Sequence, residues 1–342
     1  LSKLNEDSVS KTNDEFKYGL ENIDATILAI HDGENFVDEI TETGKPYGII
    51  LDKTCFYAEQ GGQEYDTGKI VVDGVSEFNV ENVQLYNGYV FHTGVLQEGK
   101  LSKNEKVIAS YDELRRFPLR NNHTGTHILN FALKETLGAD VDQKGSLVAP
   151  EKLRFDFSHK KALSFEELEK VEAICNKLIK ENMTVYYKEV PLELAQSIIS
   201  VRAVFGETYP DPVRVVSVGK PVEDLLADPK NDEWNNYSVE FCGGTHVAKT
   251  GDIKEFVIIE ESGIAKGIRR MVAVSGSEAY EVQRIAADFN KELDHVETLP
   301  FGPMKEKRIK ELGVELGQLS ISVISKNKLK ERFNKIEKEV KD

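Results

Sequence analysis

The first third of the chain alternates apolar and polar residues in short runs, with Gly, Asn and Asp between the runs at hairpin-like intervals. Such alternation is typical of strands, whose successive side chains point to opposite faces. Several short strands without a long helix between them predict a small β-barrel. The predicted strands span residues 26–30, 47–52, 69–72, 89–93 and 106–111.

From about residue 113, helical and strand-like periods are mixed. Ser164 and Glu167 form a capping box at the start of a helix predicted at 165–182, and a short helix follows Pro191. Residues 221–236, rich in Asp, Pro and Asn, predict a loop. Strands are predicted at 146–148, 152–157, 184–190, 213–218, 237–241, 256–260 and 269–274. This order predicts an α+β layer sandwich, with helices packed on an antiparallel sheet.

The last part of the chain is helical. A helix is predicted from about residue 277 to 291, with an interruption at Pro300 and Pro303. Apolar residues then recur among alternating charges over 305–341, which predicts an amphipathic segment. The predicted fold is therefore α+β: a small N-terminal β-barrel, a two-layer sandwich and a helical tail. The predicted division is a linker at 1–18, a β-barrel subdomain at 19–112, a core at 113–280 and a helical C-terminal segment at 281–342.

Length and composition narrow the class of protein. The 342 residues, 40% of them hydrophobic, are sufficient for two or three packed domains. No apolar run approaches the length that crosses a bilayer, and the three cysteines offer no disulfide framework. We therefore expect a soluble, cytoplasmic protein. Because the chain begins at Leu1 rather than Met, we expect an excised part of a longer parent, for which a mitochondrial form stays open.

The net charge of −15 argues against general binding to nucleic acid, because phosphate attraction requires Lys and Arg. The tail differs from the rest. Residues 304–342 contain eleven Lys and Arg against seven Asp and Glu, a local excess of four positive charges. Any contact with nucleic acid must therefore use local basic patches.

Two pairs of metal-binding side chains stand out. Asn121 and Asn122 supply a helix N-cap signal and Gly138 a stop signal, so His123 and His127 would lie one turn apart on one helix face.

Cys242 and His246 follow the strand predicted at 237–241, and the glycines between them allow a sharp fold. One thiolate and three imidazoles form the donor set of a tetrahedral zinc ion. We predict that one Zn²⁺ is held by His123, His127, Cys242 and His246.

Other interpretations of these residues are weaker or stay open. The two His could be an accidental helical pair, with Cys242 as a buried core thiol. A zincin protease would have Glu directly after the first His, where this chain has Thr124. A zinc finger needs a short loop between its ligand pairs, but Cys242 lies 115 positions after His127.

Four segments, taken in order and spacing, resemble the editing domain of alanyl-tRNA synthetases and the related free-standing alanyl editing proteins. They are Asn-Asn-His-Thr-Gly-Thr-His at 121–127, Asp-Gln-Lys-Gly-Ser-Leu-Val at 142–148, Leu-Arg-Phe-Asp-Phe-Ser-His at 153–159 and Cys-Gly-Gly-Thr-His at 242–246. The resemblance runs from about residue 20 to the C-terminus. It implies hydrolysis of the ester in mischarged tRNA(Ala), with editing roles at the positions matching Thr126, His127, Gln143 and Cys242.

Two further groups of residues are candidates for contact with the substrate. The family's barrel carries a similar glycine-rich loop beside its editing pocket, so Gly61, Gly62 and Gln63 are expected to border the substrate; the alternative is a simple hairpin loop. Arg154 and Asp156 share one face of a predicted strand, where they either shape the pocket or form a surface pair across the sheet.

The expected function is zinc-dependent deacylation of serine, and of glycine, from tRNA(Ala). Ester hydrolysis needs activated water and oxyanion stabilisation, which zinc can supply. A shell filled by four protein ligands is, however, typical of structural sites, so a tRNA-binding module with a purely structural zinc stays open, as does hydrolysis of unrelated substrates. No glycine-rich phosphate loop is present, so no ATP is expected.

The expected partner is the acceptor end of tRNA(Ala) carrying serine or glycine, with no membrane. In the family, the helical segment that matches the tail binds tRNA or pairs subunits, so self-association through the tail is possible. A solvated coiled-coil stub is the alternative for this segment.

Overall fold

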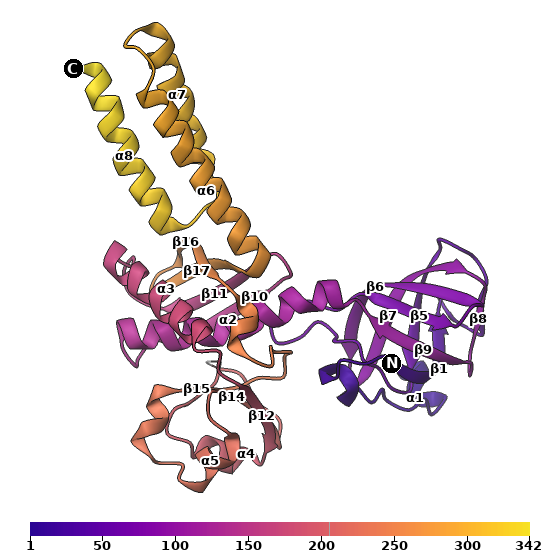
Figure 1. The fold of residues 1–342 in the computed structure, drawn as a ribbon. Coiled ribbons are helices and arrows are strands. Elements are labelled where there is room, and N and C mark those ends of the chain that lie inside the picture. The colour runs from indigo at the N-terminus through magenta and orange to yellow at the C-terminus, as the bar shows by residue number, and fades with distance from the viewer. Residues whose placement is uncertain (205) are drawn as a thin grey trace. The chain divides into compact units, whose positions relative to one another are not determined.

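The computed structural model describes residues 1–204 and 206–342, which form two compact units (Figure 1). Unit 1 comprises Leu1–Arg120 and Val148–Pro150, and unit 2 comprises Asn121–Leu147 and Glu151–Asp342. The four-part division of the chain stays a prediction. Among the helices of the described residues, none is long and apolar enough to pass through a bilayer.

A closed β-barrel makes up most of unit 1. Its strands are β1 (Ile23–His31), β4 (Pro46–Leu51), β5 (Gly68–Val72), β6 (Ser76–Tyr86), β7 (Tyr89–Glu98) and β9 (Lys106–Tyr111). They neighbour one another in the order β1-β4-β7-β6-β5-β9, and antiparallel pairing of β1 with β9 closes the ring. Closure leaves no long open edge, as expected for a small barrel.

Short elements complete unit 1. Strand β2 (Phe36–Val37) pairs with β1, and β3 (Glu39–Ile40) pairs with β8 (Leu101–Ser102). Helix α1 (Ser2–Glu6) and the 3₁₀ helix η1 (Glu15–Tyr18) precede the barrel, and Leu4 of α1 is buried.

The five predicted barrel strands are present, but the longest strand, β6, was missed. Its apolar residues begin in phase at Phe78 and Val80, and then Val83 follows after a register shift between Val80 and Asn82. A β-bulge inserts one residue and reverses the inward phase, so a search for strict period-two alternation fails here.

Helix α2 (Glu113–Leu137) continues from unit 1 into unit 2. The predicted N-cap at Asn121 and Asn122 is wrong, because the helix begins eight residues before Asn121. Asp112 caps it: its Oδ1 accepts the Leu114 N–H at 3.0 Å. Asn122 Oδ1 instead accepts the Ser275 hydroxyl at 2.6 Å, a tertiary contact that local sequence does not reveal.

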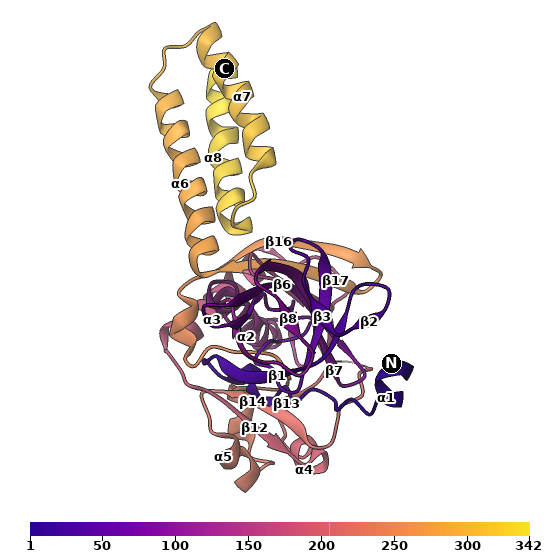
Figure 2. The same ribbon diagram turned by 90° about the vertical axis from the view of Figure 1, so that its right-hand side faces the viewer.

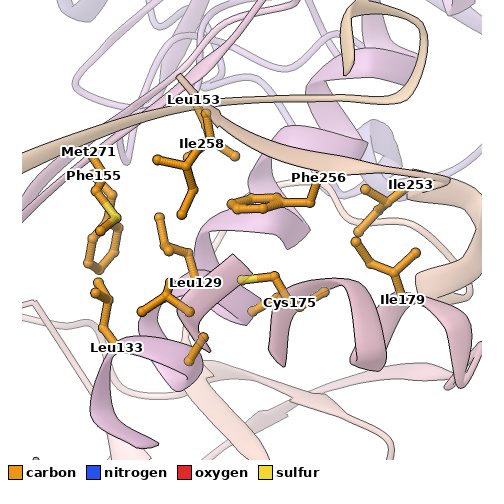
Figure 3. Close-up of a cluster of buried hydrophobic side chains, with 14 of the residues drawn as sticks. Leu129, Leu133, Leu153, Phe155, Cys175, Ile179, Ile253, Phe256, Ile258 and Met271 are labelled. Atoms are coloured by element: carbon orange, nitrogen blue, oxygen red, sulfur yellow. The ribbon is translucent and has the colours of Figure 1, made fainter. Parts of the chain in front are cut away.

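The first sheet of unit 2 contains β10 (Gln143–Val148), β11 (Leu153–Ser158), β17 (Ile268–Ser275) and β16 (Phe256–Ala265), in that order. Helices α2 and α3 (Phe165–Lys180) bury their apolar faces against it, and α3 starts with the predicted capping box. Figure 3 shows Leu129 and Leu133 of α2 and Cys175 of α3 in this core. Gly125 lets α2 approach closely, because a Cβ there would meet Leu153 at 3.0 Å.

A second sheet has the order β12-β14-β15-β13, formed by β12 (Val185–Val190), β14 (Val213–Val218), β15 (Ser238–Phe241) and β13 (Val201–Arg202). The pair β13–β15 is parallel and the others are antiparallel. Helix α4 (Leu192–Gln196) lies in this region, and η3 (Thr250–Ile253) follows β15 in the chain. The loop predicted at 221–236 is wrong in part, because it contains α5 (Val222–Ala227) and η2 (Asp232–Asn236), where Val222, Leu225 and Trp234 are buried.

Three helices end the chain: α6 (Gly276–Glu297), α7 (Pro303–Gln318) and α8 (Val323–Lys341) (Figure 2). The range 305–341, predicted to be amphipathic, contains α8 and most of α7; the chain breaks between these two helices, and both pack together with α6. Their shared core includes Phe289, Leu312 and Phe333. The predicted fold class is thus confirmed as mixed α+β: a barrel, antiparallel sheets and C-terminal helices.

Candidate metal centre

Four side chains from two distant segments converge in unit 2. His123 and His127 lie one turn apart on α2, with their rings stacked at 5.5 Å between centroids. Cys242 and His246 lie on the loop after β15. One donor atom from each residue lies within 4.8 Å of the others, so this cluster could hold a metal ion.

The distances suit a tetrahedral ion. Cys242 Sγ is 3.3 Å from His123 Nε2 and 3.3 Å from His246 Nε2, and His127 Nε2 is 3.3 Å from His246 Nε2. A tetrahedron with zinc–nitrogen bonds of about 2.0 Å and a zinc–sulfur bond of about 2.3 Å has edges of about 3.3 to 3.6 Å. The donor chemistry therefore fits the predicted ion, as do these three of the six donor–donor distances, and all six lie within 4.8 Å.

A buried carboxylate supports His127 on its other side. Glu240 Oε2 lies 2.7 Å from His127 Nδ1, with both side chains 6% exposed. The contact is an ion pair by distance, and no hydrogen bond of good geometry joins the two atoms. Asn130, one turn further along α2, donates from Nδ2 to Glu240 Oε1 at 3.2 Å.

His246 has a neutral support. Its Nδ1 lies 3.1 Å from Thr124 Oγ1, which also accepts the Val247 N–H at 3.1 Å. Thr124 is fully buried on α2. When Nε2 faces a metal, Nδ1 carries the proton and donates it to the hydroxyl oxygen.

Backbone and guanidinium contacts fix the loop that carries Cys242. The Cys242 N–H donates to the Arg214 carbonyl at 3.0 Å, and Arg214 Nη1 donates to the carbonyls of Cys242 and Gly244 at 3.1 and 2.7 Å. The Gly244 N–H points at Cys242 Sγ, 3.4 Å away. A backbone N–H aimed at sulfur stabilises the thiolate, which is the metal-binding form.

The electrostatics of the cluster favour a bound cation. Burial alone would raise the pKa of Cys242, but the neighbouring imidazoles, His123 first, hold that pKa well below 9.0. Burial opposes a charged His127, yet Glu240 and the Cys242 thiolate raise the pKa of His127 to about 10, whereas burial lowers the pKa of His246 to about 3. Without an ion, a proton on His127 compensates the buried negative charges, and a metal ion competes with that proton.

The other predicted editing residues occupy the same unit. Thr126 lies between the two His on α2, 3% exposed, and its hydroxyl donates to the His123 carbonyl at 2.6 Å. Its proton is thus used within the helix, and its oxygen can only accept from a ligand. Gln143 is the first residue of β10 and is half-buried. The editing roles of both residues stay predictions.

The predicted glycine-rich loop belongs to unit 1. Gly61 and Gly62 have φ angles of 60° and 84°, and the backbones of Gln60 and Gln63 bond to each other across them. This is the geometry of a two-residue hairpin turn, which Gly satisfies without strain. The Gly62 carbonyl accepts the Val148 N–H at 2.7 Å. Contact of this loop with a substrate stays a prediction.

Arg154 and Asp156 do not pair with each other. Asp156, 7% exposed, accepts from Arg270 Nε and Nη2 at 2.8 and 3.0 Å, and these two residues face each other across β11 and β17. Arg154 lies opposite Val272, and its Nε is buried without a hydrogen-bond partner. The structure thus pairs Asp156 across the sheet with Arg270 and not with Arg154, and a role of either residue in the pocket stays a prediction.

Sequence reasoning missed Glu240, Asn130 and Thr124 as parts of the centre. One signal was present: Glu240 is a charge inside the short run Val239–Phe241, two positions before a ligand, and charges in such strands rarely lie buried without a partner. Asn130 and Thr124 gave no comparable signal, because their contacts depend on the folded chain.

Three family models match the chain. Residues 2–115 match tRNA synthetases class II (A), residues 213–272 match the Threonyl and Alanyl tRNA synthetase second additional domain, and residues 279–342 match the Alanine–tRNA ligase domain. The second of these ranges contains Cys242 and His246. Fold, site and matches together define an aminoacyl-tRNA synthetase segment with a second additional domain.

Individual relatives narrow this class. Over 340 residues the chain is 77% identical to the mitochondrial alanine–tRNA ligase of Saccharomyces cerevisiae, covering 99% of this chain and 35% of the relative. It is 66% identical over 343 residues to the alanine–tRNA ligase of Candida albicans, covering 100% and 35%, and 40% identical over 364 residues to the cytoplasmic alanine–tRNA ligase of Drosophila melanogaster, covering 100% and 38%. The chain belongs to the alanine–tRNA ligase family and spans 35 to 38% of the length of these relatives.

Proposed function

We propose that this chain hydrolyses the aminoacyl ester of mischarged tRNA(Ala), removing serine and glycine with the help of Zn²⁺. The observation that carries the proposal is the convergence of three imidazoles and one thiolate within 4.8 Å. This convergence lies partly within the range that matches the second additional domain.

The proposed roles follow from the contacts of the chain's own residues. His123, His127, Cys242 and His246 would hold the ion, which when bound supplies Lewis-acid polarisation of an ester carbonyl. Thr126 Oγ1, which already donates to the His123 carbonyl, would accept a hydrogen bond from a serine hydroxyl. Gln143 would donate to or accept from the substrate through its amide. His127 and Cys242 would act by fixing the position of the ion.

A second candidate function is a tRNA-binding module in which the ion is structural. The observation in its favour is the complete set of four protein ligands, since a site that binds substrate on the metal usually keeps one position open. Under this alternative the ion would hold the loop after β15 against α2 and do no chemistry.

The proposed partner is the acceptor end of tRNA(Ala) carrying serine or glycine. Self-association through α6, α7 and α8 stays a prediction. The location also stays a prediction: the S. cerevisiae relative is named mitochondrial and the D. melanogaster relative cytoplasmic, so both compartments are compatible with the proposal.

The test is single-turnover deacylation of seryl-tRNA(Ala) and alanyl-tRNA(Ala) by the purified chain, before and after removal of metal. We expect seryl-tRNA(Ala) to be cleared at least a hundredfold faster than alanyl-tRNA(Ala), chelation to abolish the activity and added zinc to restore it. Tight binding of tRNA by the zinc-loaded chain without any deacylation would refute the proposal and support the binding module.

A further inference from the structure

Glu240 is a buried acid placed directly behind one metal-ligand candidate. It lies on β15, opposite Val216 of β14 and Arg202 of β13, and is 5% exposed. Both of its oxygens have partners on α2: Oε2 is 2.7 Å from His127 Nδ1, and Oε1 accepts from Asn130 Nδ2 at 3.2 Å. A carboxylate in such surroundings is costly unless these partners compensate it.

The contact selects which nitrogen of His127 faces the cluster. An imidazole has two ring nitrogens, and a neutral ring carries its proton on one of them. His127 Nδ1 lies 2.7 Å from Glu240 Oε2, so when a cation replaces the second proton of His127 the remaining proton stays on Nδ1, and Nε2, 3.3 Å from His246 Nε2, presents its lone pair to the cluster. Asn130 holds the carboxylate from its other side, so the acid cannot easily rotate away from the ring.

The supports of His127 and His246 differ in charge. His246 Nδ1 meets the neutral hydroxyl of Thr124, which it shares with the Val247 N–H. A carboxylate interacts more strongly with a ring N–H than a neutral hydroxyl does, because its oxygens carry a full negative charge. A carboxylate behind an imidazole also makes the ring a better electron donor to a metal, whereas a shared hydroxyl does so weakly.

We propose that Glu240 is a positioning residue of the metal centre. It fixes the tautomer and orientation of His127, and it makes the His127 imidazole a stronger electron donor to the metal than the His246 imidazole. Thr124 plays the same part for His246 with a smaller effect. The inference rests on the proposed metal centre, but not on the deacylation reaction.

The test measures zinc affinity by competition with a chromophoric chelator, and the visible spectrum of the cobalt-substituted chain, for three variants. We expect Glu240→Gln to weaken zinc binding 10- to 100-fold and to alter the cobalt absorption bands, because the amide keeps the shape and loses the charge. Thr124→Val should weaken binding only a few-fold. Glu193→Gln, on the exposed face of α4, is the matched control and should change neither quantity.

Melting temperatures separate positioning from general stability. A purely structural Glu240 would lower the melting temperature of the apo-chain and the zinc-loaded chain equally. We expect Glu240→Gln to reduce mainly the increase in melting temperature that zinc produces, and Glu240→Asp to recover part of that increase. Glu240→Gln keeps the size and shape of the side chain, so its effect reports the lost charge rather than lost packing.

The outcomes distinguish this inference from the proposed function. The positioning role would be overturned if Glu240→Gln bound zinc within about twofold of the parent's affinity and showed the parent's cobalt spectrum, even if the parent chain deacylates tRNA. A chain that binds no zinc at all would overturn it as well. A large loss of affinity in a chain without deacylase activity would support the positioning role and refute the proposed function.

Discussion

Each unit of the chain contains buried charged or polar groups where α2 contacts strands or loops of that unit. The two sets of groups differ in the partners that surround them. In unit 1, the Arg116 guanidinium, 1% exposed, pairs with the Asp66 carboxylate and donates to the carbonyls of Lys17 and Cys55 at 2.6 and 2.8 Å. Its face lies 3.5 Å from the centroid of the Tyr111 ring. In unit 2, the imidazole Nε2 atoms of the metal-ligand candidates point at one another and at a sulfur.

This difference distinguishes a charged group that only stabilises the fold from a cluster of side chains that could bind an ion. Around Arg116, the guanidinium N–H groups end on oxygens and the face of the group lies on a ring, so the group needs nothing from outside the chain. In the cluster of unit 2, three nitrogens and one thiolate are all electron donors that face each other, an arrangement that is unfavourable unless a cation is shared among them. Burial alone therefore does not indicate a binding site; convergence of like donors is what makes these four residues metal-ligand candidates.

Replacing a donor should have the largest effect. Cys242→Ala removes the thiolate, so we expect zinc content to fall below about half of the parent's after gentle purification and deacylation to fall more than a hundredfold. Elemental analysis and single-turnover assays measure both. Cys175→Ala, a buried thiol of the same unit outside the cluster, is the control, and an equal loss of zinc in that variant would contradict the assignment.

Breaking the ion pair between Arg116 and Asp66 should lower the stability of the barrel and leave the zinc content unchanged. Arg116→Met strands the buried Asp66 carboxylate, so we expect the barrel to lose about 3 to 5 kcal/mol of unfolding free energy, and Asp66→Leu in the same chain to restore much of it. Hydrogen exchange with mass spectrometry in urea resolves the barrel peptides. The single tryptophan, Trp234, reports on unit 2 and cannot replace that measurement.

Arg120→Met is the matched control for this experiment, because Arg120 lies one turn further along α2 and pairs with the exposed Glu113. We expect it to cost at most about 1 kcal/mol. A loss of unfolding free energy in Arg120→Met as large as that in Arg116→Met would contradict the special role of the buried pair. A loss of zinc in Arg116→Met would show that the two sets of buried groups are not independent.

The smallest expected effect concerns selectivity. Thr126→Val and Gln143→Ala should each slow clearance of serine by about 1 to 3 kcal/mol of transition-state stabilisation and clearance of glycine by less, because glycine has no hydroxyl to bind. Parallel single-turnover assays on seryl-, glycyl- and alanyl-tRNA measure this. Thr136→Val on the same helix is the control, and equal losses on serine and glycine would show that both residues serve the ester chemistry instead.

The fold was predictable where local patterns and tertiary structure agree. The strand predicted at 213–218 matches β14, and the capping box at Ser164 is present because its contacts are made within four residues. The start of α2 was not predicted correctly from Asn121 and Asn122, because the helix is capped by Asp112 and the Asn122 side chain is used in a tertiary contact with Ser275, far along the chain. Strand β6 was missed because a bulge interrupts its alternation.

The candidate metal centre was likewise predictable only where its residues lie close together in the sequence. The spacing of His123 and His127, and of Cys242 and His246, is local and could be read directly. The carboxylate behind His127 could not, because Glu240 reaches α2 only after β15 has been placed beside β14. Supporting residues are defined by contacts between helices, strands and loops that are distant in sequence. A single sequence therefore reveals the candidate ligands more readily than the residues that position them.

The separation of the two ligand pairs along the chain has a consequence for biosynthesis. Cys242 lies 115 positions after His127, so at about 5 to 20 residues per second the second pair is synthesised roughly 6 to 23 seconds after the first. During that interval the nascent chain offers only two imidazoles on α2. All four candidate ligands come together only after the loop that carries the second pair has been placed beside α2, so we expect any metal loading to be a late event that waits for contacts distant in sequence.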